Sequence, residues 1–482
     1  MRRRGWVGVF VGAMLALPSA AVAQSTTAQV PLARFFTELV AEAARIDATT
    51  SIERSDFLVA SELGATAAQL NQSIGLQLAT FPTNIGLDAP APGSADVAGA
   101  SAFAPSFAMH VGSLGSRKVS VSFSYENTSF GSLGTIGLDS NQFGFVLTPP
   151  AADQAQFGTD VLHESMSMRM QQDTATFGIL YGAGSRVDVG VAIPVVHMEL
   201  EGQIRSQIYH AGGASASDRH FFDVYPASPL QANGCSTSSV DVPGVNRAGL
   251  GTETAPIVAP FDMVELASRT VTRRCTASGL GDVVAYGKAR LVSGSTNALG
   301  VSLGVRLPTG DPDQLLGTGT TRATASLIWS ARAGRFGPHA SAGYTRSFGH
   351  GSAVFNTISD GAAVPQPLDL RVPDEIDIAA GTDVYLFSRL TTSFDVFGRQ
   401  ISDLQRFRVD STTAAALGPG DPAVPGTLLV PDGTGATLLI GVAAAQVALT
   451  DRTLLKGNLL FPVWGNGLMP RFGAAVGLGF RY

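Results

Sequence analysis

Charged side chains are scarce in this chain, and beyond its N-terminal segment it has no long apolar run. Lys, Arg, Asp and Glu make up 15% of the 482 residues, whereas soluble domains average roughly 25%. Without an apolar run of about 20 residues, the chain is not a helical membrane protein. A net charge of −6 excludes the basic footprint of a nucleic-acid-binding protein. The chain is instead rich in glycine, with 55 residues, a composition typical of a membrane β-barrel.

The N-terminus has the three parts of a secretory signal peptide. Arg2 to Arg4 form a basic start, and Trp6 to Leu17 form an apolar run. That run, about 12 residues, is too short to span a bilayer as a helix. Ala21 to Ala23 matches a cleavage site. We therefore expect residues 1–23 to be a signal peptide and the mature chain to begin near Gln24, with an uncleaved anchor as the weaker alternative.

The main evidence for the fold is a period-two alternation of apolar and polar residues in many segments. From Ala298 to Leu307, one face is apolar and the other carries Gly, Ser and Arg. Such segments have about 9–13 residues, the length of a tilted membrane strand. A soluble β-sandwich also alternates, but here the polar face is small, as the inner wall of a barrel requires. The sequence predicts an all-β fold, an antiparallel transmembrane β-barrel.

Short and long connections alternate along the chain, as in bacterial barrels with short periplasmic turns and long outer loops. Tight turns are expected near residues 115, 184, 293, 334, 388 and 451. We count thirteen strands after residue 102, and residues 74–81 (IGLQLATF) are expected to supply a first one. The preferred count is therefore about 14, with 12–16 compatible, in a barrel over residues 73–482.

The longest connection, residues 205–279, is expected to be an extracellular loop that forms a lid over the barrel mouth. It contains both cysteines, Cys235 and Cys275. An exported chain folds in an oxidising compartment, so we expect them to form a disulfide that constrains this loop. Its histidines and aspartates lack the spacing of a metal site. We expect no metal and no cofactor.

Residues 24–72 differ from the rest, because apolar residues recur there at helical spacing, as at Phe35, Leu39 and Ala43. We expect a short helical segment on the periplasmic side. It either plugs the barrel or lies outside it, and burial of its apolar face favours the plug.

The C-terminus resembles the signal that the outer-membrane assembly machinery recognises on a final strand. Phe480 and Tyr482 are aromatic at the third-last and last positions, with Gly477 before them, although Ala475 stands where the pattern prefers a polar residue. The predicted location is the outer membrane of a Gram-negative bacterium. The expected partners are this machinery, outer-membrane lipid and lipopolysaccharide.

Alternation also places a set of charged residues on the inner wall, where they pair across the lumen or line a polar conduit. Their balanced signs predict neither a strong anion nor a strong cation channel. The predicted lumen-lining residues are Asp188, Asp282, Lys288, Arg290, Arg306, Arg322, Arg332, Asp377, Asp383, Asp395, Arg399, Lys456 and Arg481.

Two neighbouring segments allow a family resemblance to be named. Residues 279–291 begin with G-x-GD, and residues 301–323 contain LPTGD followed by LGTG. This pattern resembles the MetA-pathway phenol-degradation family of outer-membrane proteins, over roughly residues 102–482. The resemblance implies a barrel of the broad fatty-acid and aromatic-hydrocarbon porin type. The Asn-Pro-Ala motif of the fatty-acid porins is missing from the N-terminal segment.

The expected function is passive transport of small molecules, hydrophobic or aromatic ones among them. The alternative is a structural or surface-interaction barrel that does not transport. A remote alternative is a lipid hydrolase using His350 and Ser352, whose i, i+2 spacing puts a base and a nucleophile on one strand face. That pair lies in a glycine-flanked turn without a clear third partner, so we expect no enzyme.

Overall fold

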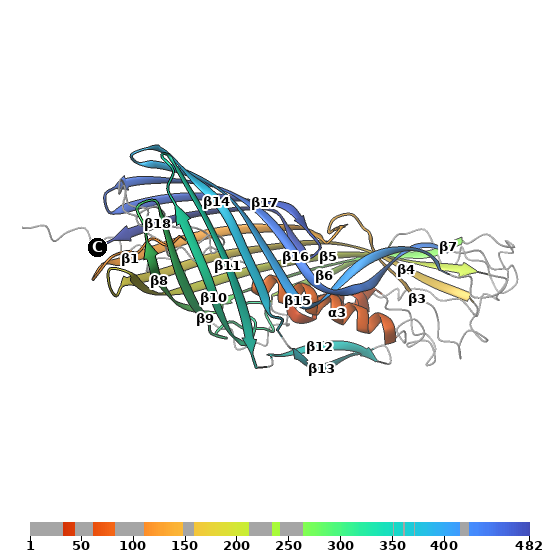
Figure 1. Ribbon diagram of the computed structural model, residues 1–482. Coiled ribbons are helices and arrows are strands. Elements are labelled where there is room, and N and C mark those ends of the chain that lie inside the picture. Colours follow the sequence, from red (N-terminus) through yellow and green to blue (C-terminus); the bar gives the residue numbers. More distant parts are fainter. Residues whose placement is uncertain are drawn as a thin grey trace, which may run out of the picture.

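Figure 1 shows the computed structural model of the chain. It describes residues 32–43, 61–81, 110–147, 159–211, 234–241, 264–349, 351–359, 362–370, 372–414 and 424–482. The predicted signal peptide lies outside the described residues, as does most of the expected outer loop.

The described strands form a closed antiparallel barrel, which confirms the predicted all-β barrel architecture. Each barrel strand pairs with two neighbours, and the ring closes because β1 pairs with both β18 and β4. Twelve strands make the ring: β1 (Val119–Leu133), β4 (Thr159–Gly182), β5 (Val187–Ala211), β8 (Val284–Ser293), β9 (Asn297–Arg306), β10 (Thr321–Ala331), β11 (Phe336–Phe348), β14 (Glu375–Phe387), β15 (Leu390–Ala414), β16 (Val424–Thr450), β17 (Thr453–Gly465) and β18 (Leu468–Arg481).

Other strands lie outside this ring. Four of them extend its sheet: β2 (Ile136–Gly137), β3 (Phe143–Leu147), β6 (Cys235–Asp241) and β7 (Val264–Leu280). A separate hairpin contains β12 (Gly351–Ser359) and β13 (Ala362–Leu370). The preferred count of about 14 barrel strands is therefore not matched.

The strand expected at residues 74–81 is wrong, because these residues belong to helix α3 (Ser61–Thr80). Leu70, Ile74 and Leu78 are all buried and recur every four residues, the spacing of a helix face. The short IGLQLATF segment alternates on its own, but the helix face that begins before it continues through it. The expected domain boundary at residue 72 falls inside this helix.

Away from the N-terminal helices, the barrel has a polar interior and an apolar exterior. On β1, Ser120, Ser122 and Ser124 are buried, whereas Phe123 and Tyr125 are 40% and 42% exposed. The same reversal recurs on β10, where Leu327 and Trp329 face outward and Ser330 is buried. Because successive side chains of a strand point to opposite faces, the period-two pattern of the sequence becomes an inner and an outer wall.

The two ends of the barrel differ. At one end, which we call the turn end, hairpins close in a few residues, and each tight turn expected from the sequence lies there. This end also carries the C-terminus (Figure 1). At the other, the loop end, four strands are extended: β4, β5, β15 and β16 have 24 to 27 residues, whereas β8 to β11 have 10 to 13.

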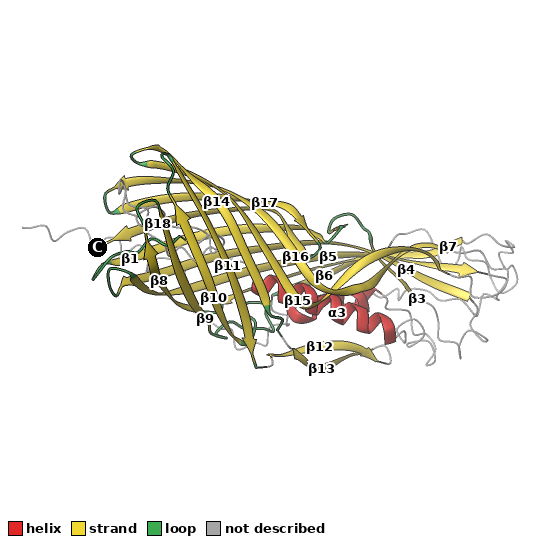
Figure 2. Ribbon diagram, in the orientation of Figure 1, coloured by secondary structure: helices red, strands yellow, loops and turns green. Residues whose placement is uncertain are grey.

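The N-terminal helices pack in the loop-end half, beside the long strands (Figure 2). They are the 3-10 turn η2 (Leu32–Arg34), α2 (Phe35–Ala43) and α3. Helix α2 contacts β5, β7 and the β12–β13 hairpin, and α3 contacts β12, β15 and β16. Their apolar side chains share one buried cluster with the inner faces of β4, β5 and β7. In the described part of the chain, no helix is long and apolar enough to cross a membrane.

Candidate functional site

A small, partly open cavity of about 30 Å³ lies inside the barrel where helix α3 ends. The end of α3 forms one side of it, and inward-facing residues of β4 and β5 form another. The lining residues are Leu78, Ala79, Phe81, Gln172, Thr176, Ala192, Pro194, Val196, Gly281, Asp282, Val284, Arg306, Leu315 and Leu316. In this closed arrangement the cavity has room for about two water molecules. Most of the lining side chains are apolar, so a wider state of the same cavity would suit a small, largely apolar molecule.

The wall beside the cavity contains a break in a strand. Strand β5 pairs with β8 up to Ala192 and with β7 from Val195 onward. Residues 281–283 connect β7 to β8 without belonging to either strand. The amide of Gly281 still donates to the carbonyl of Pro194 at 2.9 Å. The break turns the chain at the level where β9 ends, and the cavity opens there.

Asp282, at this break, holds the loop between β9 and β10. Its carboxylate accepts hydrogen bonds from the amide of Gly310 at 3.1 Å, from the amide of Thr318 at 2.9 Å and from the Thr318 hydroxyl at 3.0 Å. A Cβ on Gly317 would come within 2.4 Å of the same carboxylate. The G-x-GD, LPTGD and LGTG motifs of the sequence therefore meet in one structure, a loop folded against the cavity.

Arginines from the barrel wall cap the C-terminal end of α3. The last carbonyls of a helix have no partner within it and carry partial negative charge. Arg306 donates to the carbonyl of Ala79 at 3.2 Å, and Arg399 donates to the carbonyl of Thr80. These two contacts fix the end of the helix across the interior of the barrel.

A buried ion-pair network supports these arginines. Arg322 pairs with Glu375 at 2.7 Å, and the Nε of Arg399 lies 2.6 Å from Asp377 and 3.5 Å from Glu375. Among the described residues, Glu375 and Asp377 thus pair with Arg322 and Arg399. Pairing of opposite charges offsets the cost of removing them from water. The network spans β10, β14 and β15 and crosses the interior next to the end of α3.

A second closure lies at the turn end, where residues 110–118 enter the barrel. The amide of Leu114 donates to Asp188, and Arg481 donates to the carbonyl of Leu114 at 3.1 Å. Lys288 donates to the carbonyl of His110 at 3.1 Å. Val111 is buried against Ala298 and Ile328. Polar and apolar contacts together thus hold this segment in the interior.

Of the described residues, His110, His339 and Asp383 have the composition of a metal site, with ligand atoms within 4.8 Å of one another. The geometry favours an ion-pair cluster instead. Both ring nitrogens of His339 are engaged, Nδ1 with the carbonyl of Gly337 at 3.1 Å and Nε2 with Asp395 at 2.7 Å. Two lysines lie nearby: Lys288 bonds to His110, and Lys456 lines the same small cavity. Their charges oppose binding of a divalent cation.

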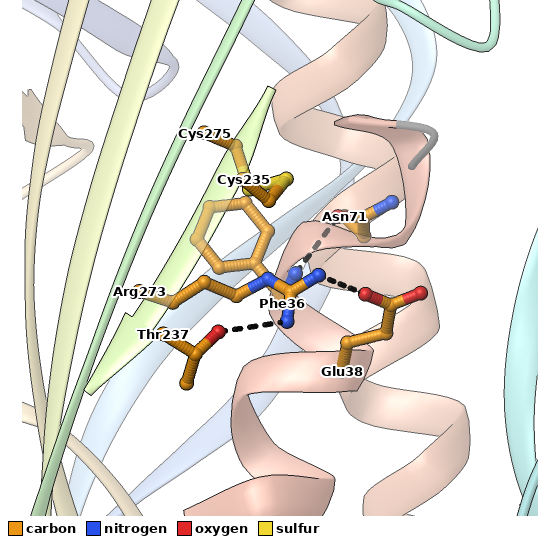
Figure 3. The surroundings of a disulfide bond; sticks show 7 residues. All are labelled: Phe36, Glu38, Asn71, Cys235, Thr237, Arg273 and Cys275. Carbon is orange, nitrogen blue, oxygen red and sulfur yellow. Dashed lines mark hydrogen bonds and ion pairs between the residues drawn. A yellow bond between two sulfur atoms is a disulfide. The ribbon is translucent and has the colours of Figure 1, made fainter. Parts of the chain in front are cut away.

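Helix α2 is held at the loop end beside a disulfide (Figure 3). Cys235 and Cys275, the pair expected from the sequence, face each other on β6 and β7 and are bonded. Both are buried in the cluster that contains α2, so the bond contributes to a core as well as constraining a loop. Two residues before Cys275, Arg273 pairs with Glu38 of α2 and donates to the Thr237 hydroxyl at 3.2 Å.

The predicted lumen-lining residues divide into two groups by exposure. Seven are buried: Asp188, Asp282, Lys288, Arg322, Asp383, Asp395 and Lys456. Six are half-buried: Arg290, Arg306, Arg332, Asp377, Arg399 and Arg481. The structure gathers most of them into the two closures. Arg290 lies apart and donates to the Ser185 carbonyl at 2.9 Å, and Arg332 stacks over the Tyr385 ring at 4.8 Å.

Several residues of these closures were not predicted. Glu375 and His339 face inward on β14 and β11 and could have been found by extending the alternation. Gln172 is likewise buried on the inner face of β4. His110 precedes β1 and has no periodic signal. Its position depends on contacts with residues far along the chain.

The remaining predicted sites are placed as follows. Phe480 pairs with Val121 and Thr453 at the seam of the barrel, Gly477 lies opposite Ser124, and Tyr482 is 72% exposed. These positions do not test recognition by an assembly machinery. His350 of the hydrolase alternative lies outside the described residues. The backbone of Ser352 is in β12, opposite Asp369.

Among the comparisons with known proteins, only the comparison with solved structures finds similarity. No family model and no curated protein matches the chain. An outer membrane channel from Pseudomonas putida F1 is 10% identical over 76% of this chain and 96% of that one, with a TM-score of 0.39. The Pseudomonas putida toluene transporter TodX is 11% identical over 84% and 97%, with a TM-score of 0.30.

The translocator domain of the autotransporter NalP from Neisseria meningitidis scores in the same range, with 9% identity over 76% and 89% and a TM-score of 0.29. Similarity this low transfers no function. The resemblance to the MetA-pathway family stays a prediction.

Proposed function

We propose that this chain is an outer-membrane β-barrel that passively transports small, largely apolar molecules. The observation that carries the proposal is the reversed polarity of the barrel around an internal cavity. A water-soluble monomer rarely exposes a continuous apolar patch beyond a few hundred Å². Here exposed Val, Leu, Ile or aromatic side chains occur on every strand of the ring. On β8 and β16 they lie near the turn end.

The outer face of strand β5 supports a membrane-spanning band of limited height. Its outward residues are apolar from Val187 to Val195, all at least 37% exposed. From His197 onward they are polar, and Glu199 pairs with Arg274 at 2.6 Å. The apolar stretch has the length of a tilted membrane strand, about 9–11 residues. In this proposal the turn end faces the periplasm and the loop end faces the outside, as in bacterial barrels. This orientation places α2 and α3 in the outer half of the barrel and not on the periplasmic side that the sequence led us to expect.

The proposal includes the partners expected from the sequence. The apolar band would contact outer-membrane lipid, and the polar outer face above it would lie at the level of lipopolysaccharide. The exposed C-terminal Tyr482 and the strand that ends at it would be available to an assembly machinery.

Transport through this barrel requires motion. The arginines at the end of α3 and residues 110–118 both cross the interior, so the described arrangement is a closed one. The charges inside are paired with opposite signs. Such an interior favours neutral solutes over either class of ion.

The same closure supports the second candidate, a barrel that acts through its surface and does not transport. The long strands β4, β5, β15 and β16 and the additional strands β6 and β7 project beyond the apolar band. An extended outer sheet of this kind offers a surface for other molecules at the loop end.

Uptake of a small neutral solute into proteoliposomes distinguishes the two. The mature chain, refolded to a heat-modifiable band on gels, is expected to raise uptake of cyclohexanol above that of empty liposomes. Uptake equal to that of empty liposomes, with folding verified, would leave the surface role.

A further inference from the structure

Gln172 stands out among the residues that line the cavity. It is 5% exposed and faces inward on β4, four residues before Thr176, which lines the same cavity. Its Nε2 lies 3.5 Å from the Thr174 hydroxyl, a weak contact. Its Oε1 has no hydrogen-bond partner among the described residues. A buried amide oxygen without a hydrogen-bond partner is energetically unfavourable, so this group favours a ligand that supplies a partner.

The chemistry of the amide defines what that ligand must offer. The two ends of a Gln side chain are interchangeable by rotation. If the oxygen turns toward Thr174, then the NH₂ group is left facing the cavity. A hydroxyl satisfies either arrangement, because it can donate to the oxygen or accept from the nitrogen. A carbonyl, which only accepts, or an ammonium, which only donates, satisfies only one.

The two charged residues of the cavity, Asp282 and Arg306, are already engaged in hydrogen bonds within the protein. Both carboxylate oxygens of Asp282 accept hydrogen bonds from the loop, and Arg306 donates to the end of α3. Neither side chain is therefore available to pair with a charged ligand. The remaining lining is mainly apolar, with Leu78, Phe81 and Leu316 among its side chains.

We infer that Gln172 is a specificity-determining residue, which selects small neutral molecules with an apolar body and a single hydroxyl. The inference rests on the proposed function, because it assigns the substrate class of the same cavity. The ligand enters when the end of α3 moves and widens the cavity. Its hydroxyl then bonds to the Gln172 amide, and its apolar body packs on the end of α3 and on the loop held by Asp282. A hydrocarbon of equal shape leaves the Gln172 amide without a partner, so its affinity does not depend on this residue.

The test uses two ligands of nearly equal shape, cyclohexanol and methylcyclohexane, on the full mature chain in lipid nanodiscs. Dissociation constants come from ligand-observed NMR, with empty nanodiscs subtracted. Gln172→Leu removes the amide at similar volume. Gln171→Leu is the matched control, since Gln171 is exposed on the outer face one residue away. A fold check by gel mobility accompanies each variant.

Q172L is expected to weaken cyclohexanol binding about two- to tenfold, the range of one net hydrogen bond, and to leave the affinity for methylcyclohexane unchanged or raise it. Q171L is expected to change neither. Equal affinities of Q172L and wild type for cyclohexanol, or an equal loss of affinity for both ligands, would overturn the assignment. The partner of the Gln172 amide would then be a water molecule and not the ligand. If that occurs while proteoliposome uptake persists, then only the role of Gln172 fails. Absence of uptake overturns the proposed function itself.

Discussion

The carboxylate of Asp282 accepts a hydrogen bond from the backbone amide of Thr318 at 2.9 Å, across 36 positions of sequence. It also accepts one from the amide of Gly310. One side chain therefore fixes both ends of the loop between β9 and β10. This loop supplies Leu315 and Leu316 to the cavity wall, so the shape of the cavity depends on Asp282.

Asp282→Ala is expected to loosen this loop without unfolding the barrel. Loss of the hydrogen bonds to a buried carboxylate should lower the local free energy of opening by roughly 2–4 kcal/mol. Hydrogen exchange at the Gly310 and Thr318 amides measures this directly. Asp311→Ala is the control, because the Asp311 carboxylate accepts from the amide of its local neighbour Asp313 at an exposed position. Equal protection of these amides in D282A and wild type would contradict the account.

The arginine caps of α3 give a prediction about gating. Arg399→Ala removes the donor to Thr80 and the partner of Asp377, so the end of α3 should leave the interior more often. We expect roughly tenfold more frequent openings in single-channel recordings, as for one lost charge-assisted bond. Arg290→Ala is the control, since Arg290 bonds an exposed carbonyl at the turn end. Identical recordings from R399A and R290A would show that α3 does not gate the barrel.

Much of the barrel follows from local pattern. The period-two alternation and the positions of the tight turns depend on neighbouring residues, and both were predicted. The helix over residues 61–80 was missed in its last part, because IGLQLATF also fits a short strand. What decides between the two is burial of Leu70, Ile74 and Leu78 on one face against the barrel wall. That is a tertiary effect.

The site was predictable only where it lies on strands. Alternation placed Asp383 and Asp395 inside, and it could also have placed Glu375 and Gln172. It could not show that Asp282 would bind a loop rather than line a lumen, since this depends on the break between β7 and β8. His110 has no local signal at all.

The disulfide should stabilise the docking of α2. Replacing Cys235 and Cys275 together by Ala is expected to lower the free energy of unfolding by about 2–4 kcal/mol. The loss should be local, because the pair lies beside Arg273, the partner of Glu38. Amide exchange should therefore increase in α2, β6 and β7 and stay unchanged in β17 and β18. Unchanged exchange in α2 would refute the link between the disulfide and the helix.

Glu164 gives a pH-dependent prediction for the loop-end sheet, well beyond the apolar band. Burial raises the pKa of its carboxyl from 4.5 to about 8, with a small opposing effect from the Ser206 hydroxyl. When the sheet opens, the group ionises near its ordinary pKa. Stability of this region is therefore greatest below about pH 4.5 and falls as pH rises toward 8.

Exchange of the β4 amides near Glu164 should accordingly increase between pH 5 and 8 beyond the intrinsic chemical rate. Glu164→Gln keeps the side-chain shape and should abolish the excess. The neighbouring Ser165→Ala, on the opposite face, should retain it. The same pH dependence in E164Q and wild type would assign the effect to another group.

The most direct test of plugged passive transport is the single-channel conductance of two nested deletions beside the full mature chain. Removing residues 24–80 takes away α2 and α3, and removing residues 24–112 also takes away His110 and Val111. We predict rare openings in the full chain, more in the first deletion and steady openings in the second, because each deletion removes one closure. Silence in all three, with folding shown by heat-modifiable gel mobility, would contradict a transport barrel.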